Sequence, residues 1–180
     1  MKIRASNCSA YGVTALKLAY ANTDAPGRMN EVFHDLAERL AGEGMRAVGA
    51  VQVNISRGPD LPCDMELMLL PDGKRIGISQ RLGRAAEGCR LNAGALEQSV
   101  METSRRLADG ADLLIVNKFG PHEAEGHGFR ELIGNALAEG IPVLVGVSTS
   151  HLEDFHQFAQ GYGQMVPCET EALHDWLLET

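Results

Sequence analysis

The chain alternates between short, continuous apolar runs and longer stretches in which apolar residues recur at helical spacing. The apolar runs predict strands at residues 14–20, 45–53, 113–116, 142–147 and 164–166. Helical spacing is clearest where Val32, Phe33, Leu36 and Leu40 share one face, before a stop at Gly42. Further helices are predicted at residues 93–108, 129–139, 152–159 and 169–178.

The middle of the chain breaks this alternation. Residues 65–70 and 75–79 flank the turn sequence PDGK, which predicts a β-hairpin. Asn92 stands where it can cap the helix that follows. Strands and helices that alternate on both sides of a hairpin predict an α/β fold. We expect a three-layer α/β/α sandwich with a mostly parallel sheet and a β-hairpin insertion.

The domain organisation follows from where the periodicity begins. Residues 1–13 show none, and we interpret them as an N-terminal arm, either loose or borrowed by a partner as an edge strand. Residues 14–180 contain no internal repeat and no linker, and this length suffices for one hydrophobic core. The sequence therefore predicts a single α/β domain at 14–180.

Composition narrows the classes of partner. The formal net charge of −8 repels phosphate backbones and anionic lipid, so we expect no nucleic-acid binding. No apolar run approaches the roughly 20 residues that span a bilayer, which argues against membrane insertion. The first residues lack the apolar middle of a secretory signal, so we expect a cytoplasmic protein. Its four widely spaced cysteines then indicate reduced thiols.

Candidate chemistry gathers directly after predicted strands. The sequence NKFGPHEAEGHGFRE, residues 117–131, follows the central apolar run, and residues 21–30 and 146–151 follow two other strands. In open parallel sheets, ligands bind beyond the carboxyl ends of the strands. We therefore expect a site where these three segments meet.

The loop after the first strand lacks the parts of a phosphate cradle. A nucleotide hydrolase would carry G-x-x-x-x-G-K-[ST] there, whereas residues 22–30 have one glycine, no lysine and the repelling Asp24. Arg28 fits either an anion contact at a helix N-terminus or an ordinary solvated arginine. Asn117 replaces the acidic residue that would order Mg²⁺. Asn117 and Lys118 match the first two residues of the guanine-reading element N-K-x-D. The aspartate that would read guanine is missing, because Gly120 stands at its position.

Two long blocks carry a resemblance to a known family. They read CDMELMLLPDGKRIGISQRLGRAAEGCRLNAGALE, at 63–97, and ADLLIVNKFGPHEAEGHGFRELIGNALAEGIPVLVGV, at 111–147. The chain resembles, over roughly residues 14–178, the bacterial family domain of unknown function 2478. That family is similar to P-loop nucleoside triphosphatases of the thermophile type, whose Asp-Glu-Ile-Gly block corresponds to 117–120 here. The resemblance implies a P-loop NTPase-like fold and, since some members are labelled molybdenum-transport-associated, a molybdenum context. Asn92 stands where the family usually has aspartate.

Cationic and acidic groups from two loops form the main candidate site. Arginine's planar fork suits phosphate or another tetrahedral oxyanion. If the loops at 80–92 and 117–131 meet, they make an anion site; the alternative is a salt-bridge network that pins the hairpin to the sheet. The candidate ligand-binding residues are Arg28, Gln80, Arg84, Arg90, Asn117, Lys118, Gly120, Glu123, Glu125 and Arg130.

Two thiols and two imidazoles form a weaker constellation. Cys63, Cys89, His122 and His127 would make a tetrahedral zinc site if their loops converged. Their wide spacing does not require this, and small buried thiols are commoner. A Cys/His nucleophilic pair is chemically feasible, but no third group is placed to orient it.

Three classes of function remain open at this point. The leading hypothesis is a cytoplasmic binding or regulatory protein for a small anion, either a nucleotide phosphate or an oxyanion such as molybdate. An active nucleoside triphosphatase or a Cys-dependent hydrolase is the second class. A ligand-free interaction module, such as a homodimer, is the third. No motif names a cofactor.

Overall fold

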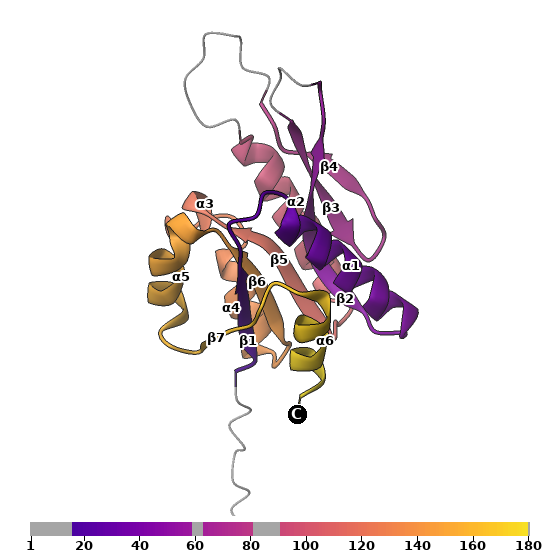
Figure 1. Cartoon of the computed structure of the whole chain (residues 1–180), viewed down its shortest axis with the longest axis vertical. Coiled ribbons are helices and arrows are strands. Elements are labelled where there is room, and N and C mark those ends of the chain that lie inside the picture. The colour runs from indigo at the N-terminus through magenta and orange to yellow at the C-terminus, as the bar shows by residue number, and fades with distance from the viewer. Residues whose placement is uncertain (1–15, 59–62, 81–90, 180) are drawn as a thin grey trace, which may run out of the picture.

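The computed structural model describes residues 16–58, 63–80 and 91–179, which fold around one seven-stranded sheet (Figure 1). The strand order is β4-β3-β2-β5-β6-β1-β7. Strand β3 pairs antiparallel with both β2 and β4, and the other pairings are parallel. The strands are β1 (Leu18–Asn22), β2 (Ala47–Ile55), β3 (Asp64–Leu70), β4 (Arg75–Gly77), β5 (Leu113–Phe119), β6 (Val143–Val147) and β7 (Gly163–Met165).

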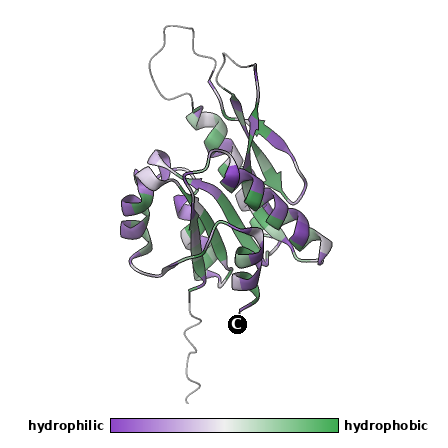
Figure 2. Ribbon diagram, viewed as in Figure 1, coloured by the Kyte–Doolittle hydropathy of each residue, from purple (hydrophilic) through white to green (hydrophobic). Residues whose placement is uncertain are grey.

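Helices cover both faces of the sheet. They are α1 (Arg28–Gly42), α2 (Ala93–Leu107), α3 (Pro121–Ala124), α4 (Arg130–Ala138), α5 (Leu152–Ala159) and α6 (Thr170–Leu178). Helices α1 and α6 share one apolar cluster with the sheet, and α2, α4 and α5 share the other. Figure 2 shows the apolar residues concentrated on the strands and the polar ones on the outer sides of the helices. The predicted three-layer sandwich with a β-hairpin is therefore confirmed.

Local signals explain why several elements begin and end where they do. Helix α2 begins after Asn92, whose side-chain oxygen accepts a hydrogen bond from the Ala95 N–H at 3.0 Å. Strand β5 continues three residues past the predicted end at Val116, because Asn117 and Phe119 are buried and pair with β6. None of the described helices is long and apolar enough to cross a bilayer.

Two glycines permit close approaches, one between two neighbouring strands and one between a strand and a helix. Gly49 in β2 has φ +140°, and a Cβ there would lie 1.9 Å from the carbonyl oxygen of Ile115 in β5. Gly146 in β6 leaves room for Met29, whose Sδ would lie 2.3 Å from an added Cβ. The first turn of α1 consequently sits directly on the end of β6.

A salt-bridge network does tie the hairpin to the helical layer, through residues other than those predicted. Arg106 of α2 donates from Nε to Asp72 at 2.9 Å and from Nη1 to Glu102 at 2.9 Å, and Lys74 Nζ lies 3.2 Å from Glu102. Hydrogen bonds from Arg106 and Lys74 lower the pKa of the Glu102 carboxyl. Because the turn at 71–74 is at the amino end of β2, this network lies away from the carboxyl rim.

Candidate functional site

A polar hollow of about 230 Å³ lies at the carboxyl rim of the sheet, and we call it the rim hollow. It collects the loop after β1, the start of α1, the ends of β2 and β5, and the residue after β6. Its lining residues are Thr23, Asp24, Ala25, Pro26, Gly27, Met29, Asn30, Gln52, Asn54, Asn117, Lys118 and Ser148. The three segments expected to meet at the rim therefore do meet there.

The N-terminus of α1 forms one side of the rim hollow. The helix follows Gly27, whose φ is +78°, and no side chain caps it. The first turn of a helix leaves backbone N–H groups without intrahelical partners and carries a partial positive charge, so it attracts anions. If Gly27 stands for the second glycine of the phosphate-binding motif, Arg28 replaces its lysine and Met29 its hydroxyl residue. Met29 is buried and offers Mg²⁺ no oxygen.

Asn117 ends the regular part of β5 at the centre of the rim. It is 3% exposed, and its Nδ2 donates to Asn30 Oδ1 at 2.8 Å. Its Oδ1 is buried without a hydrogen-bond partner among the described residues. Leaving such an acceptor unsatisfied costs about 1–3 kcal/mol, so a ligand donor here would be stabilising.

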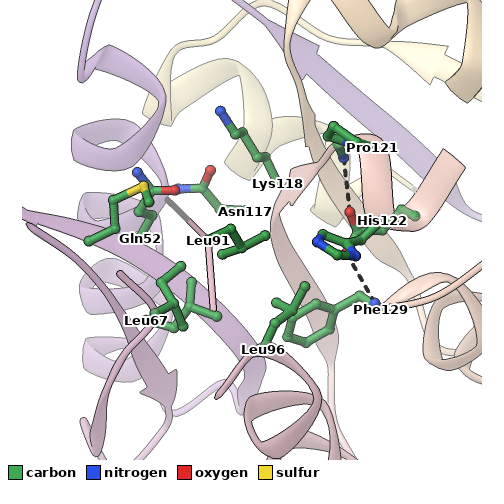
Figure 3. A pocket seen from close by; sticks show the side chains of 13 residues that line it. Gln52, Leu67, Leu91, Leu96, Asn117, Lys118, Pro121, His122 and Phe129 are labelled. Carbon is green, nitrogen blue, oxygen red and sulfur yellow. Dashed lines mark hydrogen bonds between the residues drawn. The ribbon is translucent and has the colours of Figure 1, made fainter. Parts of the chain in front are cut away.

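Lys118 follows on a bulge of β5 and is exposed. It lines the rim hollow, and it is the one lysine or arginine among the described lining residues. In Figure 3 its amino group points away from Leu96 and Phe129. The opposing charge is Asp24, which is exposed and accepts a hydrogen bond from the Thr149 hydroxyl. The rim hollow thus contains two groups that attract anions, a lysine and a helix N-terminus, and one exposed carboxylate that repels them.

A second hollow of about 220 Å³ adjoins the first, and we call it the apolar cleft (Figure 3). It lies between the β3–β4 hairpin, α2 and the segment at 120–129. It shares Gln52, Asn117 and Lys118 with the rim hollow. Its lining residues are Gln52, Met65, Leu67, Ile78, Leu91, Leu96, Asn117, Lys118, Gly120, Pro121, His122, Glu123 and Phe129.

Glu123 organises the wall of the apolar cleft. Its side chain is 3% exposed and accepts backbone N–H groups from Gly120 at 3.0 Å and Phe129 at 3.2 Å. Burial raises the pKa of the Glu123 carboxyl, and the two N–H groups oppose that rise. Gly128, with φ +57°, is required beside it, because an added Cβ would lie 2.2 Å from Glu123 Oε1. Glu123 therefore shapes the loop that forms the cleft.

The substitution Glu123→Gln is expected to lower the free energy of unfolding by about 1–3 kcal/mol at pH 7, because its amide group would face a backbone N–H donor. The folded-state pKa of Glu123 lies above its usual 4.5, so protonation favours the folded wild type. The wild type should gain stability from this group as pH falls from 7 toward 4.5, and the variant should not. Urea unfolding at several pH values measures the difference in unfolding free energy between the wild type and the variant, which should widen as pH falls. The exposed control Glu125→Gln should leave stability unchanged, and a gap independent of pH would contradict this role.

The remaining predicted ligand residues are distributed more widely. Arg130 stacks on Phe158, with its guanidinium 4.6 Å from the ring centre, and donates to the Glu123 carbonyl at 3.1 Å. Glu125 is exposed at the end of α3. Gln80 donates to the Leu91 carbonyl at 2.9 Å. These three side chains line neither hollow, because each is held by a partner or faces solvent.

Arg28 also points elsewhere. It is exposed on α1, and its charge opposes the rise that burial causes in the pKa of Cys168, before α6. Arg84, Arg90 and Cys89 lie outside the described residues. Leu91, next in the chain, lines the apolar cleft together with Lys118.

Three of the four candidate zinc ligands are among the described residues, and those three do not form a group with metal-binding spacing. His122 lines the apolar cleft, whereas Cys63 and His127 are exposed. Within the described part of the chain, one group of three side chains has metal-binding spacing, and it consists of His34, Asp35 and Glu38 on the surface of α1.

Several lining residues were missed from the sequence. The apolar pattern predicts only a strand end at Gln52 and a loop at Asn54, although polar residues at alternate positions there indicate a side facing the rim. Leu67, Leu96 and Phe129 carry no such signal, since a cleft wall and a core have the same apolar pattern.

Comparisons with known proteins agree with this architecture. The family described as "Protein of unknown function (DUF2478)" matches residues 18–176. The "Molybdenum import ATP-binding protein ModC 2" of Bradyrhizobium diazoefficiens is 32% identical over 180 residues, covering 94% of this chain. The chain spans 20% of the length of that relative. The solution structure of a human cancer-related nucleoside triphosphatase matches with a TM-score of 0.59 at 13% identity, over 83% of this chain and 87% of its own. The chain has a P-loop NTPase-like α/β fold and belongs to the DUF2478 family.

Proposed function

We propose that this protein binds a small oxyanion at the rim of an NTPase-like fold without hydrolysing nucleotides. The observation that carries the proposal is the pairing of Lys118 with the uncapped N-terminus of α1 across one polar hollow. A helix N-terminus and a lysine are the two features that most simply attract an anion. Thr23, Asn54 and Ser148 add neutral hydrogen-bonding groups around them.

The size of the rim hollow favours a small ligand group. Its volume of about 230 Å³ lies below the roughly 300–1,000 Å³ that is typical of pockets for drug-sized molecules. A tetrahedral anion fits such a space better than a whole nucleoside triphosphate. The asparagine at position 117 also leaves the site without the carboxylate that holds Mg²⁺ in related hydrolases.

The name of the Bradyrhizobium diazoefficiens relative makes molybdate the first anion to test. That protein is described as molybdenum-importing and ATP-binding, but the matched part is one fifth of its length. ATP binding by the whole relative therefore need not reside in the matching part. We propose that this binding takes place in the cytoplasm, in keeping with the acidic composition of the chain.

The substitution Lys118→Gln should weaken molybdate binding about 10- to 100-fold, since hydrogen bonds to charged groups contribute about 1.5–3 kcal/mol. Isothermal titration calorimetry with molybdate, sulfate and phosphate measures the change. Lys74→Gln is the matched control, because Lys74 lies at the hairpin turn and pairs with Glu102. That variant should bind as the wild type does.

Two outcomes would contradict the proposal. One is a wild-type protein that binds none of the three anions, and the other is an equal loss of affinity in both lysine variants. A parallel assay of phosphate release from Mg²⁺-ATP should show no turnover. Turnover that Lys118→Gln abolishes would instead favour an active triphosphatase.

A further inference from the structure

We propose that the natural ligand has two parts, an oxyanionic group in the rim hollow and a flat aromatic ring in the apolar cleft. This inference rests on the proposed function and names the ligand class of that site. The two hollows share Gln52, Asn117 and Lys118, so a molecule held at Lys118 has the cleft directly beside it. A free tetrahedral anion would leave the cleft unused.

The walls of the cleft suit a ring. In Figure 3, Leu67 lies on one side of the space, and Leu96 and Phe129 lie on the other. Leu67 is 2% exposed and Phe129 3% exposed, so both are anchored in the core and present fixed apolar surfaces. Rigid apolar walls with a few polar groups at one edge are the usual design of a small-molecule pocket.

The polar edge of the cleft lies on the side of the rim hollow. Gln52 donates its amide to Asn54 at 2.8 Å, which fixes the orientation of its side chain. Asn117 is 3% exposed, and its Oδ1 has no hydrogen-bond partner among the described residues. Because a buried acceptor favours a partner, a ring that carries an N–H donor matches this edge better than a hydrocarbon ring.

The direction of Lys118 separates the two parts of the ligand. Its amino group points away from the apolar walls, and the residue also lines the rim hollow. An anionic group bonded directly to the ring would therefore meet the lysine while the ring remains between Leu67 and Phe129. The ligand class is an aromatic heterocycle with a phosphate or similar oxyanion attached.

Three probes test this division by calorimetry, namely inorganic phosphate, 1-naphthyl phosphate and indol-3-yl phosphate. We expect 1-naphthyl phosphate to bind at least tenfold more tightly than inorganic phosphate, and indol-3-yl phosphate to bind more tightly still.

Leu91→Trp fills the cleft from a partly exposed position and should remove the tenfold gain without changing the affinity for inorganic phosphate. Met65→Trp fills the same cleft from β3 and should have the same effect. It replaces Leu91→Trp in the test if that variant is misfolded. The control Met101→Trp, at a 56% exposed position on α2, should retain the gain.

The outcomes separate this inference from the function on which it rests. If inorganic phosphate or molybdate binds but 1-naphthyl phosphate gains nothing, the two-part ligand is wrong and oxyanion binding stands. The same holds if the gain survives both cleft-filling variants. Ring binding that Lys118→Gln leaves unchanged also overturns the two-part ligand. Equal affinities for the two aryl phosphates overturn the role given to Asn117, and failure of all anions to bind overturns both proposals.

Discussion

The substitution Gly49→Ala is expected to lower the free energy of unfolding by about 3–5 kcal/mol, because it combines backbone strain with overpacking. Gly49 has φ +140°, a conformation that residues with a side chain rarely adopt. A methyl group there would lie 1.9 Å from the Ile115 carbonyl oxygen, where β2 pairs with β5. The clash is with backbone, so no change of side-chain rotamer relieves it.

Urea unfolding followed by circular dichroism measures this effect. The matched control is Gly77→Ala, another strand glycine, where an added Cβ has no atom within 4 Å. The control should change stability by less than about 1 kcal/mol, in either direction. Equal stabilities of the two variants would contradict the close pairing of β2 and β5, the two strands that carry Gln52 and Asn117 to the rim hollow.

The substitution Asn117→Asp should lower stability by about 3 kcal/mol at pH 7, since it buries a charge that has no cationic partner among the described residues. Burial should raise the pKa of the new carboxyl above the usual value of about 3.9. A carboxyl whose folded-state pKa is raised costs stability as pH rises through that pKa, and the cost disappears as pH falls below the unfolded value. The defect should therefore shrink on acidification. The same negative charge should weaken binding of molybdate at the rim hollow.

Asn54→Asp is the control, because it adds the same charge at an exposed position of the same hollow. It should weaken molybdate binding with little loss of stability. Unfolding curves from pH 4 to pH 8 distinguish the two variants. A defect at Asn117→Asp that does not depend on pH would contradict the buried, uncharged environment assigned to that strand end.

Much of the fold could be predicted because it depends on local patterns. The apolar run at 113–116 identified the central strand, and Asn92 marked the start of α2. Helix α3 and the continuation of β5 could not be predicted in this way. They depend on the buried polar side chains of Asn117 and Glu123. Asn117 donates to Asn30, which is distant in the sequence, and Glu123 accepts from the Phe129 N–H in its own loop.

Two of the predicted ligand-binding residues, Asn117 and Lys118, lie together at the rim hollow, and their role in binding stays a prediction. Arg130 was assigned to the same site because of its charge, but its position is decided by Phe158, which lies 28 residues later in the sequence and 4.6 Å away in space. Gln52 was not predicted as a site residue, because the residues that line the hollow with it, Asn117 and Lys118, belong to β5 and are distant in the sequence. Sequence patterns identify which groups carry chemistry, and the register of the parallel strands decides which of them meet.

The most direct measurement is a crystal structure of the protein with molybdate, using anomalous scattering at the molybdenum absorption edge. We expect the strongest anomalous peak in the rim hollow, within hydrogen-bonding distance of Lys118 Nζ and of the backbone N–H groups that begin α1. A strongest peak at another surface, or an empty rim hollow that is open to solvent in the crystal, would contradict oxyanion binding at this site.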